Sequence, residues 1–181
     1  MRQMLEVGAQ GASRVKLLLA RRFGVLIDYE GDREKQRRGI DLKIQPWGYV
    51  EVKTDRHDTT NFFFEFECSG KPSGIMTSQA SWYAYYFPLL DCIYMLPVVQ
   101  LRQYIKKNWN WFTAKYKRKV LSHSSNRGWS ATGFALPRDY ICAAMPVVIY
   151  NDYKNRLWLV AGEEKKHEKS ASNKKGNTIE P

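Results

Sequence analysis

Three residues in the first third of the chain have the types and spacing for metal-assisted hydrolysis. Asp41 stands in the run GIDLKI, and Glu51 and Lys53 stand in the run EVK. Side chains of a β-strand alternate between its two faces, so Glu51 and Lys53 share one face of their strand. Two converging carboxylates can hold a divalent cation, and a neighbouring ammonium can orient a water and offset charge on a phosphate. These residues predict phosphodiester hydrolysis with Mg²⁺, for which Mn²⁺ substitutes, because carboxylates and waters suit these ions better than zinc.

A β-hairpin is the element that would position these residues. Residues 40–45 and 49–55 both alternate apolar and polar side chains, and Pro46-Trp47-Gly48 separates them. A three-residue loop there places Asp41 opposite Lys53 and the two carboxylates on a diagonal of one face, at most about 8 Å apart. A two-residue loop would break the alternation. The alternative interpretation is a cross-strand ion pair between Asp41 and Lys53 on a solvated face, which contributes under about 1 kcal/mol.

The surrounding pattern predicts an α/β fold in which helices flank a central sheet. Residues 12–22 have the pattern of an amphipathic helix closed by Gly24, and residues 30–38 that of a charged loop. Apolar residues recur at helical spacing in residues 77–87, which predicts a second long helix after a turn at residues 71–74. Strands are predicted at residues 25–29, 61–68, 91–96, 146–150 and 156–160, and a further helix at residues 98–107.

Composition and charge favour a polyanionic partner. The chain has 181 residues, is 44% hydrophobic and carries a formal net charge of +11, which together predict one globular domain. The segment from Cys92 to Arg138 contains nine basic residues and no acidic residue. Each basic residue that contacts a phosphate releases counterions, so this segment suits a nucleic acid, and a solvated basic surface is the alternative. Aromatic and basic residues interleave without a clear period in residues 108–137, and no structure is predicted there.

The sequence argues against a membrane partner and against a secreted, disulfide-bonded protein. It contains no apolar run of about 18 residues. Its three cysteines are odd in number and far apart, and the amino terminus lacks the apolar core of a secretory signal. We therefore expect a cytoplasmic protein. Residues 161–181 carry almost no apolar side chain, which predicts a disordered tail after a domain of residues 1–160.

The order of these motifs resembles the PD-(D/E)XK nuclease superfamily, which includes restriction endonucleases and archaeal Holliday junction resolvases. The likeness covers about residues 15–96 and is carried by Gly39-Ile40-Asp41 on one strand and Glu51-Val52-Lys53 on the next. The stretch FEFECSGKPSGIMTSQASWYAYYFP is similar to nucleases of phages and mobile elements, so the compartment would include a host cytoplasm. The resemblance implies a restriction-endonuclease-like core of order αβββαβ, with a central mixed sheet, flanking helices and a basic C-terminal extension.

The resemblance also implies roles for individual residues. Asp41 and Glu51 would bind the metal together with the Val52 carbonyl, and Lys53 would be the catalytic lysine. Many members of the superfamily carry a Glu on the first helix, whereas this helix reads Ala12-Ser13-Arg14-Val15. Glu6 or Glu30 could take the place of this Glu, and Glu65 could supply a further carboxylate. Gln79 resembles the polar residue that some members place near the scissile phosphate.

Each accessory position has a structural alternative, which is exposed pairing for Glu65 and helix capping for Gln79. Candidate DNA contacts are basic residues and the start of the second long helix: Lys35, Arg37, Arg38, Lys71, Ser78, Lys115, Lys117, Arg118 and Lys119. Trp109, Trp111 and Tyr116, which stand among the basic residues of the range 106–119, could stack on bases or belong to the core.

These features predict a Mg²⁺-dependent DNA endonuclease that acts as a homodimer, because cutting both strands needs two active sites. A structure-selective enzyme of the Holliday junction resolvase kind and a sequence-specific restriction or homing endonuclease both fit. A DNA-binding protein that retains the nuclease fold without activity is the alternative from another class. An RNA-binding module is a third, with only charge and aromatic residues in its favour.

Overall fold

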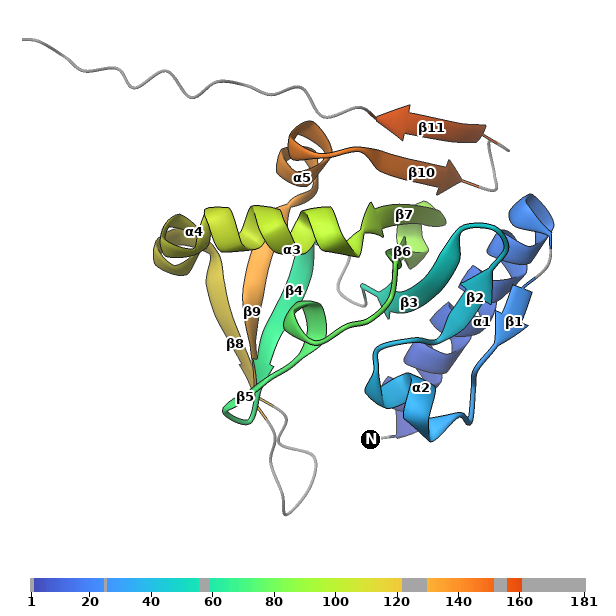
Figure 1. The fold of residues 1–181 in the computed structure, drawn as a ribbon, viewed down its shortest axis with the longest axis horizontal. Helices are drawn as coiled ribbons and strands as arrows, with labels where there is room; N and C mark the ends of the chain where they lie inside the picture. The colour runs from blue at the N-terminus through green and yellow to red at the C-terminus, as the bar shows by residue number, and fades with distance from the viewer. Residues whose placement is uncertain (1, 25, 56–58, 122–129, 152–155, 161–181) are drawn as a thin grey trace, which may run out of the picture.

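The computed structural model (Figure 1) describes the chain except for residues 1, 25, 56–58, 122–129, 152–155 and 161–181. The predicted tail at residues 161–181 therefore lies outside the described residues. The helices within the described part are α1 (Arg2–Phe23), α2 (Arg33–Arg37), α3 (Val98–Lys107), α4 (Trp109–Tyr116), α5 (Arg138–Ala144) and the short 3-10 helices η1 (Gly74–Met76) and η2 (Pro88–Leu90).

The described strands form two sheets. The larger sheet has the order β1 (Leu26–Asp28), β2 (Leu42–Ile44), β3 (Gly48–Thr54), β6 (Trp82–Phe87), β7 (Cys92–Pro97), β10 (Val147–Asn151) and β11 (Arg156–Val160). The smaller sheet has the order β5 (Lys71–Pro72), β4 (Asn61–Cys68), β9 (Ser130–Pro137) and β8 (Lys117–Leu121). In the larger sheet β3 and β6 run parallel and the other described pairs run antiparallel. The sheet is therefore mixed, as predicted.

Each face of the larger sheet contributes residues to a hydrophobic core. One face packs against α1 and includes Val15, Leu18, Leu42, Val50 and Ala84 in its core. The opposite face packs against the smaller sheet and α3, α4 and α5, through a core rich in aromatic residues: Phe62, Phe64, Tyr83, Tyr85, Phe87, Phe112 and Phe134. Figure 1 shows α1 beside β1–β3 at one side of the molecule and the smaller sheet with α4 at the other. The α/β class with helices flanking a mixed sheet is confirmed.

Helix α1 begins at Arg2, ten residues before the predicted start at residue 12. The sequence pattern placed the start after Gly11, since glycine disfavours helix interiors. A Cβ at Gly11 would collide with the Thr54 side chain, so this glycine is where α1 approaches β3 most closely. At the other end, the Gly24 N–H donates to the Ala20 carbonyl at 3.0 Å with a φ of +82°. The predicted closure by Gly24 is confirmed.

The predicted helix at residues 77–87 is wrong. Its second half is β6, a central strand buried on both faces, and η1 precedes it. Because every residue from Tyr83 to Phe87 is buried, the strand shows no alternation of polar and apolar side chains. A short, continuous apolar run of this kind has the same periodicity in a strand and in a buried helix. The crossover from β3 to β6 therefore runs through β4, β5 and η1 rather than through the helix that the αβββαβ order implies.

The remaining predictions are mostly confirmed, except that α2 was not predicted. Residues 30–38 were expected as a loop, but they contain α2, whose first turn is capped by the Asp32 side chain accepting from the Lys35 N–H at 3.0 Å. The unassigned residues 108–137 hold α4, β8 and β9. The strands predicted at residues 25–29, 61–68, 91–96, 146–150 and 156–160 and the helix at residues 98–107 are confirmed. Among the described residues, no helix is both long and apolar enough to cross a bilayer.

Candidate active site

The hairpin of β2 and β3 places the three candidate residues on one face of the larger sheet. Leu42 pairs with Val50 and Lys43 with Tyr49, and Asp41 lies just before β2, where its N–H donates to the Val50 carbonyl at 3.0 Å. The predicted register is wrong by two residues, since the loop is formed by residues 45–47 rather than 46–48. The error leaves each side chain on its predicted face because the side-chain period of a strand is also two. Asp41 and Glu51 lie close enough for the charge of Glu51 to contribute to raising the pKa of Asp41.

Glu51 is a buried carboxylate with one satisfied and one unsatisfied oxygen. Its residue surface is only 6% exposed, and Oε1 lies 2.5 Å from Lys53 Nζ. Oε2 is buried without a hydrogen-bond partner among the described residues. Gly39 lies against this oxygen, at a φ of +66°, so closely that a Cβ there would stand 2.5 Å from Oε2. Burying a polar atom without a partner is unfavourable, so Oε2 is suited to accept a donor or a cation even though Oε1 is paired with Lys53.

Asp41 is half-buried beside Glu51 and held by the backbone of β3. Its Oδ2 accepts a hydrogen bond from the Val52 N–H at 2.7 Å. Burial, together with the negative charge of Glu51, raises the pKa of Asp41 even though this hydrogen bond acts in the opposite direction. The N–H and C=O of one strand residue point to the same side, so the Val52 carbonyl is directed toward the strand that carries Asp41.

Lys53 joins the site to solvent. Its side chain is 38% exposed, and its ammonium lies 5.7 Å from the centre of the Tyr83 ring. Burial disfavours the ammonium, but the attraction of Glu51 outweighs it and raises the pKa of Lys53. Lys53 therefore carries its charge at neutral pH, and its side chain is partly exposed to solvent.

The donors present are compatible with a divalent cation that keeps several waters. The structure offers two carboxylates, one of them with an unsatisfied buried oxygen, and the Val52 carbonyl. Magnesium is commonly bound by one or two carboxylates plus substrate phosphates. No group of three or more His, Cys, Asp and Glu side chains in the described part of the chain is arranged to hold a metal. The fit therefore rests on Asp41 and Glu51.

Of the accessory carboxylates, Glu30 and Glu65 are engaged with other residues. Glu30 binds Lys16 of α1 at 2.6 Å, and its side chain is 71% exposed. Glu65 accepts from the Ser73 hydroxyl at 2.5 Å, yet its charge helps raise the pKa of Lys53. Glu6 lies in α1, and its side chain is outside the described residues. The first helix brings Lys16 toward Asp41 instead, since the charge of Lys16 lowers the pKa of Asp41.

The segment after η1 covers the site although it is not a helix. Ser78 is buried, and its hydroxyl lies 3.4 Å from the Gly39 carbonyl. Gln79 meets Arg38 twice, through its N–H to the Arg38 carbonyl at 2.8 Å and through Oε1 to Arg38 Nε at 2.7 Å. Arg102 of α3 holds the segment by donating to the carbonyls of Ile75 and Ser78. Contrary to the prediction, Ser78 and Gln79 therefore do not start a helix. Both instead contact the segment just before Asp41, at Gly39 and Arg38.

Sequence reasoning missed several residues that shape this site. Tyr83 pairs with Glu51 across β3 and β6, and its buried hydroxyl has no hydrogen-bond partner among the described residues. Burial and the charge of Glu51 raise the pKa of this phenol. Gly39 shapes the site by lying against Glu51 Oε2, and Arg102 by holding the segment that contains Ser78. Of these, Gly39 carried a signal, since glycine next to a candidate catalytic strand often marks close approach.

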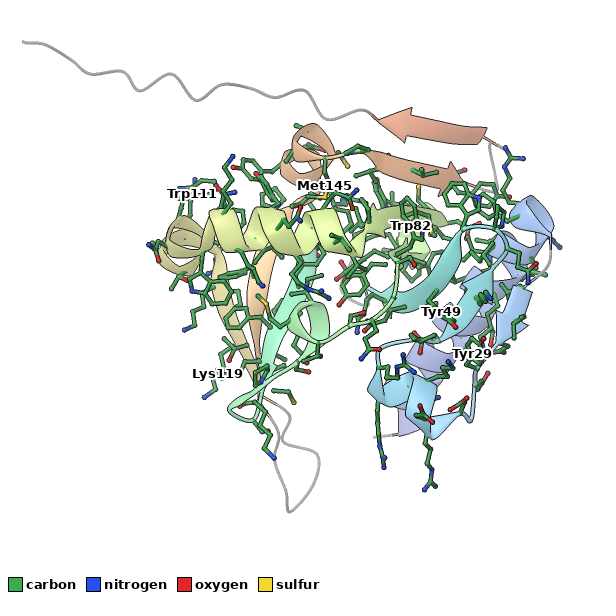
Figure 2. The ribbon with its side chains drawn as sticks, viewed as in Figure 1. Tyr29, Tyr49, Trp82, Trp111, Lys119 and Met145 are labelled. Atoms are coloured by element: carbon green, nitrogen blue, oxygen red, sulfur yellow. The ribbon has the colours of Figure 1, made fainter. Side chains whose placement is uncertain are left out.

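The predicted DNA-contacting residues separate into two regions. Lys35, Arg37 and Arg38 lie in or next to α2, a few residues before Asp41 and β2. Lys71 is exposed on β5, and β8 presents exposed Lys117, Arg118 and Lys119 at the edge of the smaller sheet. Lys115 lies 5.6 Å from the centre of the Trp111 ring. In Figure 2, Trp111 and Lys119 are at the opposite side of the molecule from Tyr49, so the basic segment does not surround the carboxylates.

No protein-family model, curated protein or solved structure matches the chain. The function is therefore argued from the chemistry of the site.

Proposed function

We propose that the chain is a Mg²⁺-dependent endonuclease that hydrolyses phosphodiester bonds in DNA. The observation that carries the proposal is the buried, unsatisfied Glu51 Oε2 next to Asp41, on the same face as the solvent-accessible Lys53. A purely structural ion pair on a solvated face does not account for these two features. It does not explain why a carboxylate oxygen is buried without a donor, or why a second carboxylate lies beside it. Mn²⁺ would substitute for Mg²⁺.

Each residue would have a separate task. Asp41 and Glu51 hold the ion, with the Val52 carbonyl directed to the same side. When bound, the ion polarises a phosphate oxygen and lowers the pKa of a water. The Lys53 ammonium exchanges its contact with Glu51 for a non-bridging phosphate oxygen, where it offsets the charge that develops in the transition state. The hydrogen bond from the Val52 N–H fixes the orientation of Asp41.

The resemblance to PD-(D/E)XK nucleases is part of this proposal. The succession α1, β1, β2 and β3 follows the order of that core, with the short α2 inserted between β1 and β2. Asp41 directly precedes β2, and Glu51-Val52-Lys53 stand on the neighbouring β3. The parallel pairing of β3 and β6 fits a crossover, although one built from strands. A homodimer and selectivity for branched DNA belong to the same proposal, with sequence-specific cleavage as the alternative.

A specific observation favours a second candidate, a DNA-binding protein without activity. Lys53 Nζ is 2.5 Å from Glu51, and the described residues supply no third carboxylate to the pair. A permanent ion pair would occupy the position of the cation. This candidate predicts binding to DNA without cleavage under any metal.

The experiment that decides between the two uses supercoiled, linear, four-way-junction and single-stranded DNA with Mg²⁺, Mn²⁺ or EDTA. We expect cleavage only with metal, and a loss of at least about 100-fold in rate for Lys53→Ala and for Asp41→Asn. Lys107→Ala, at an exposed lysine of α3, is the matched control and should keep the wild-type rate. Cleavage that persists in both site variants refutes the site. Binding of DNA without any cleavage by the wild type establishes the second candidate.

A further inference from the structure

A cluster of two tyrosines and two lysines lies on the sheet face that carries the candidate site. The Tyr29 and Tyr49 rings are 6.2 Å apart with an interplanar angle of 52°. Lys35 Nζ lies 5.4 Å from the centre of the Tyr29 ring and 5.1 Å from that of Tyr49. Lys43 Nζ lies 5.7 Å from the Tyr49 ring centre. Figure 2 shows Tyr29 and Tyr49 next to one another beside β2, β3 and α2.

This tyrosine–lysine cluster adjoins the carboxylates directly. Tyr49 precedes Glu51 by two residues on β3 and pairs with Lys43 across the hairpin. Two residues along a strand span roughly 7 Å, so the cluster lies about one nucleotide's length from Glu51. It also lies outside the aromatic core that covers Tyr83 and Tyr85, since neither Tyr29 nor Tyr49 belongs to that core.

The charges of the cluster are available to a ligand. Lys16 and Arg38 are engaged with acidic side chains. In the part of the chain that the structure describes, Lys35 and Lys43 have no acidic partner, and their ammonium groups rest on the ring faces instead. Both rings are partly exposed. A cation–π contact at a partly exposed site is weaker than the stacking of a base on an aromatic ring, so a nucleotide can replace it.

We infer that the tyrosine–lysine cluster is a subsite for an unstacked nucleotide of single-stranded DNA next to the scissile phosphate. The base stacks on the Tyr29 and Tyr49 rings, and Lys35 and Lys43 turn from the rings to the adjoining phosphates. This inference rests on the proposed nuclease function and adds the substrate class. A fully paired duplex keeps its bases stacked on one another, so the cluster selects single strands and branched DNA with unpaired nucleotides.

The test measures binding without catalysis, in EDTA, by fluorescence anisotropy. The probes are a labelled oligothymidine of about a dozen nucleotides, within the span that one single-strand-binding fold covers, and a blunt duplex of the same length. Tyr49→Ala and Tyr29→Ala should each weaken binding to the single strand about fivefold to hundredfold, the range found for removal of a stacking ring. Binding to the duplex should not change. Tyr49→Phe keeps the ring and should bind as the wild type does.

A matched control lies at the other side of the molecule. Trp111→Ala also removes a partly exposed ring that carries a lysine ammonium, and it should leave single-strand binding unchanged. Lys43→Ala should reduce the slope of log K against log salt by about 0.7 on single strands. Equal losses on single strand and duplex, no loss in either tyrosine variant, or a larger loss in Trp111→Ala would each overturn the inference. If Tyr49→Ala unfolds β3, Tyr29→Ala still tests the inference, because Tyr29 lies outside the strands, just after β1.

The two proposals fail separately. Asp41→Asn retains the cluster, so it should bind the single strand as tightly as the wild type while losing cleavage. Cleavage that survives Asp41→Asn ends the nuclease site, whatever the tyrosine variants do. Normal single-strand binding by Tyr29→Ala and Tyr49→Ala, together with cleavage that depends on Asp41, ends the nucleotide subsite alone.

Discussion

Gly39 offers the sharpest test of the proposed site, because a single methyl group there would contact the Glu51 carboxylate. In Gly39→Ala the new Cβ would stand 2.5 Å from Glu51 Oε2 and 3.0 Å from the Ser78 hydroxyl oxygen. The first of these atoms is the end of a flexible side chain, so it can give way while the backbone of β3 stays in place. The substitution therefore displaces the carboxylate without dismantling the hairpin.

Two separate costs follow from this geometry. A φ of +66° is unfavourable for alanine, and we expect a loss of about 1–2 kcal/mol in the free energy of unfolding. Glu51 must also retreat by roughly 1 Å to reach ordinary contact, and a misplacement of that size reduces the rate about 100-fold. This factor corresponds to about 2.7 kcal/mol in activation free energy.

Gly31→Ala separates the two costs. Gly31 has a φ of +90°, and a Cβ there would meet no atom within 4 Å. The assay compares Tm, the rate of DNA cleavage and the Mn²⁺ affinity by calorimetry for both variants. Both should lose similar stability, and only Gly39→Ala should lose activity and metal affinity. Equal activities in the two variants, at temperatures where both are folded, would show that the position of Glu51 Oε2 is irrelevant to function.

The remaining predictions concern the charge of the site and of the distant basic strand. Burial raises the pKa of Asp41 in the folded state, so its ionised form destabilises the fold at neutral pH. Asp41→Asn should therefore raise Tm at neutral pH, and the gain should vanish below about pH 3.9, where the carboxyl is protonated in both the folded and the unfolded state. Calorimetry across this pH range measures the gain, and no gain at neutral pH would contradict a raised pKa of Asp41. Replacing the exposed Lys115, Lys117, Arg118 and Lys119 by Gln should lower the salt dependence of duplex binding by roughly 0.9 in log–log slope for each residue that contacts a phosphate. Replacing Lys106 and Lys107 on α3 is the control. If the slope of the four-residue variant does not change relative to the wild type, Lys115 and β8 do not contact the DNA.

The stabilising effect of Asp41→Asn and its expected loss of cleavage express the same physical fact. A carboxylate kept half-buried beside another carboxylate disfavours the fold but is ready to receive a cation. Active sites commonly carry this kind of conflict between stability and function. If the variant were both more stable and fully active, the half-buried charge at Asp41 would need another explanation.

The face shared by Asp41, Glu51 and Lys53 was predictable because it depends on the local period of two residues along each strand. An error of two residues in the hairpin register preserved this face. The helix–strand error at β6 arose where this local signal is missing, since a strand buried on both faces no longer alternates. The short α2 was missed for a related reason, because none of its five residues is buried and they form no apolar stripe.

Sequence alone determined the alternation that unites the three candidate residues, the excess of basic residues and most of the strands, because each depends on residues close together in the chain. Only the tertiary structure decided that Gly39 and Ser78 enclose Glu51, that Tyr29 and Tyr49 meet beside the carboxylates, and that β8 lies at the far side of the molecule. These features depend on contacts between segments distant in sequence. The packing of both sheet faces, rather than any local pattern, determines them.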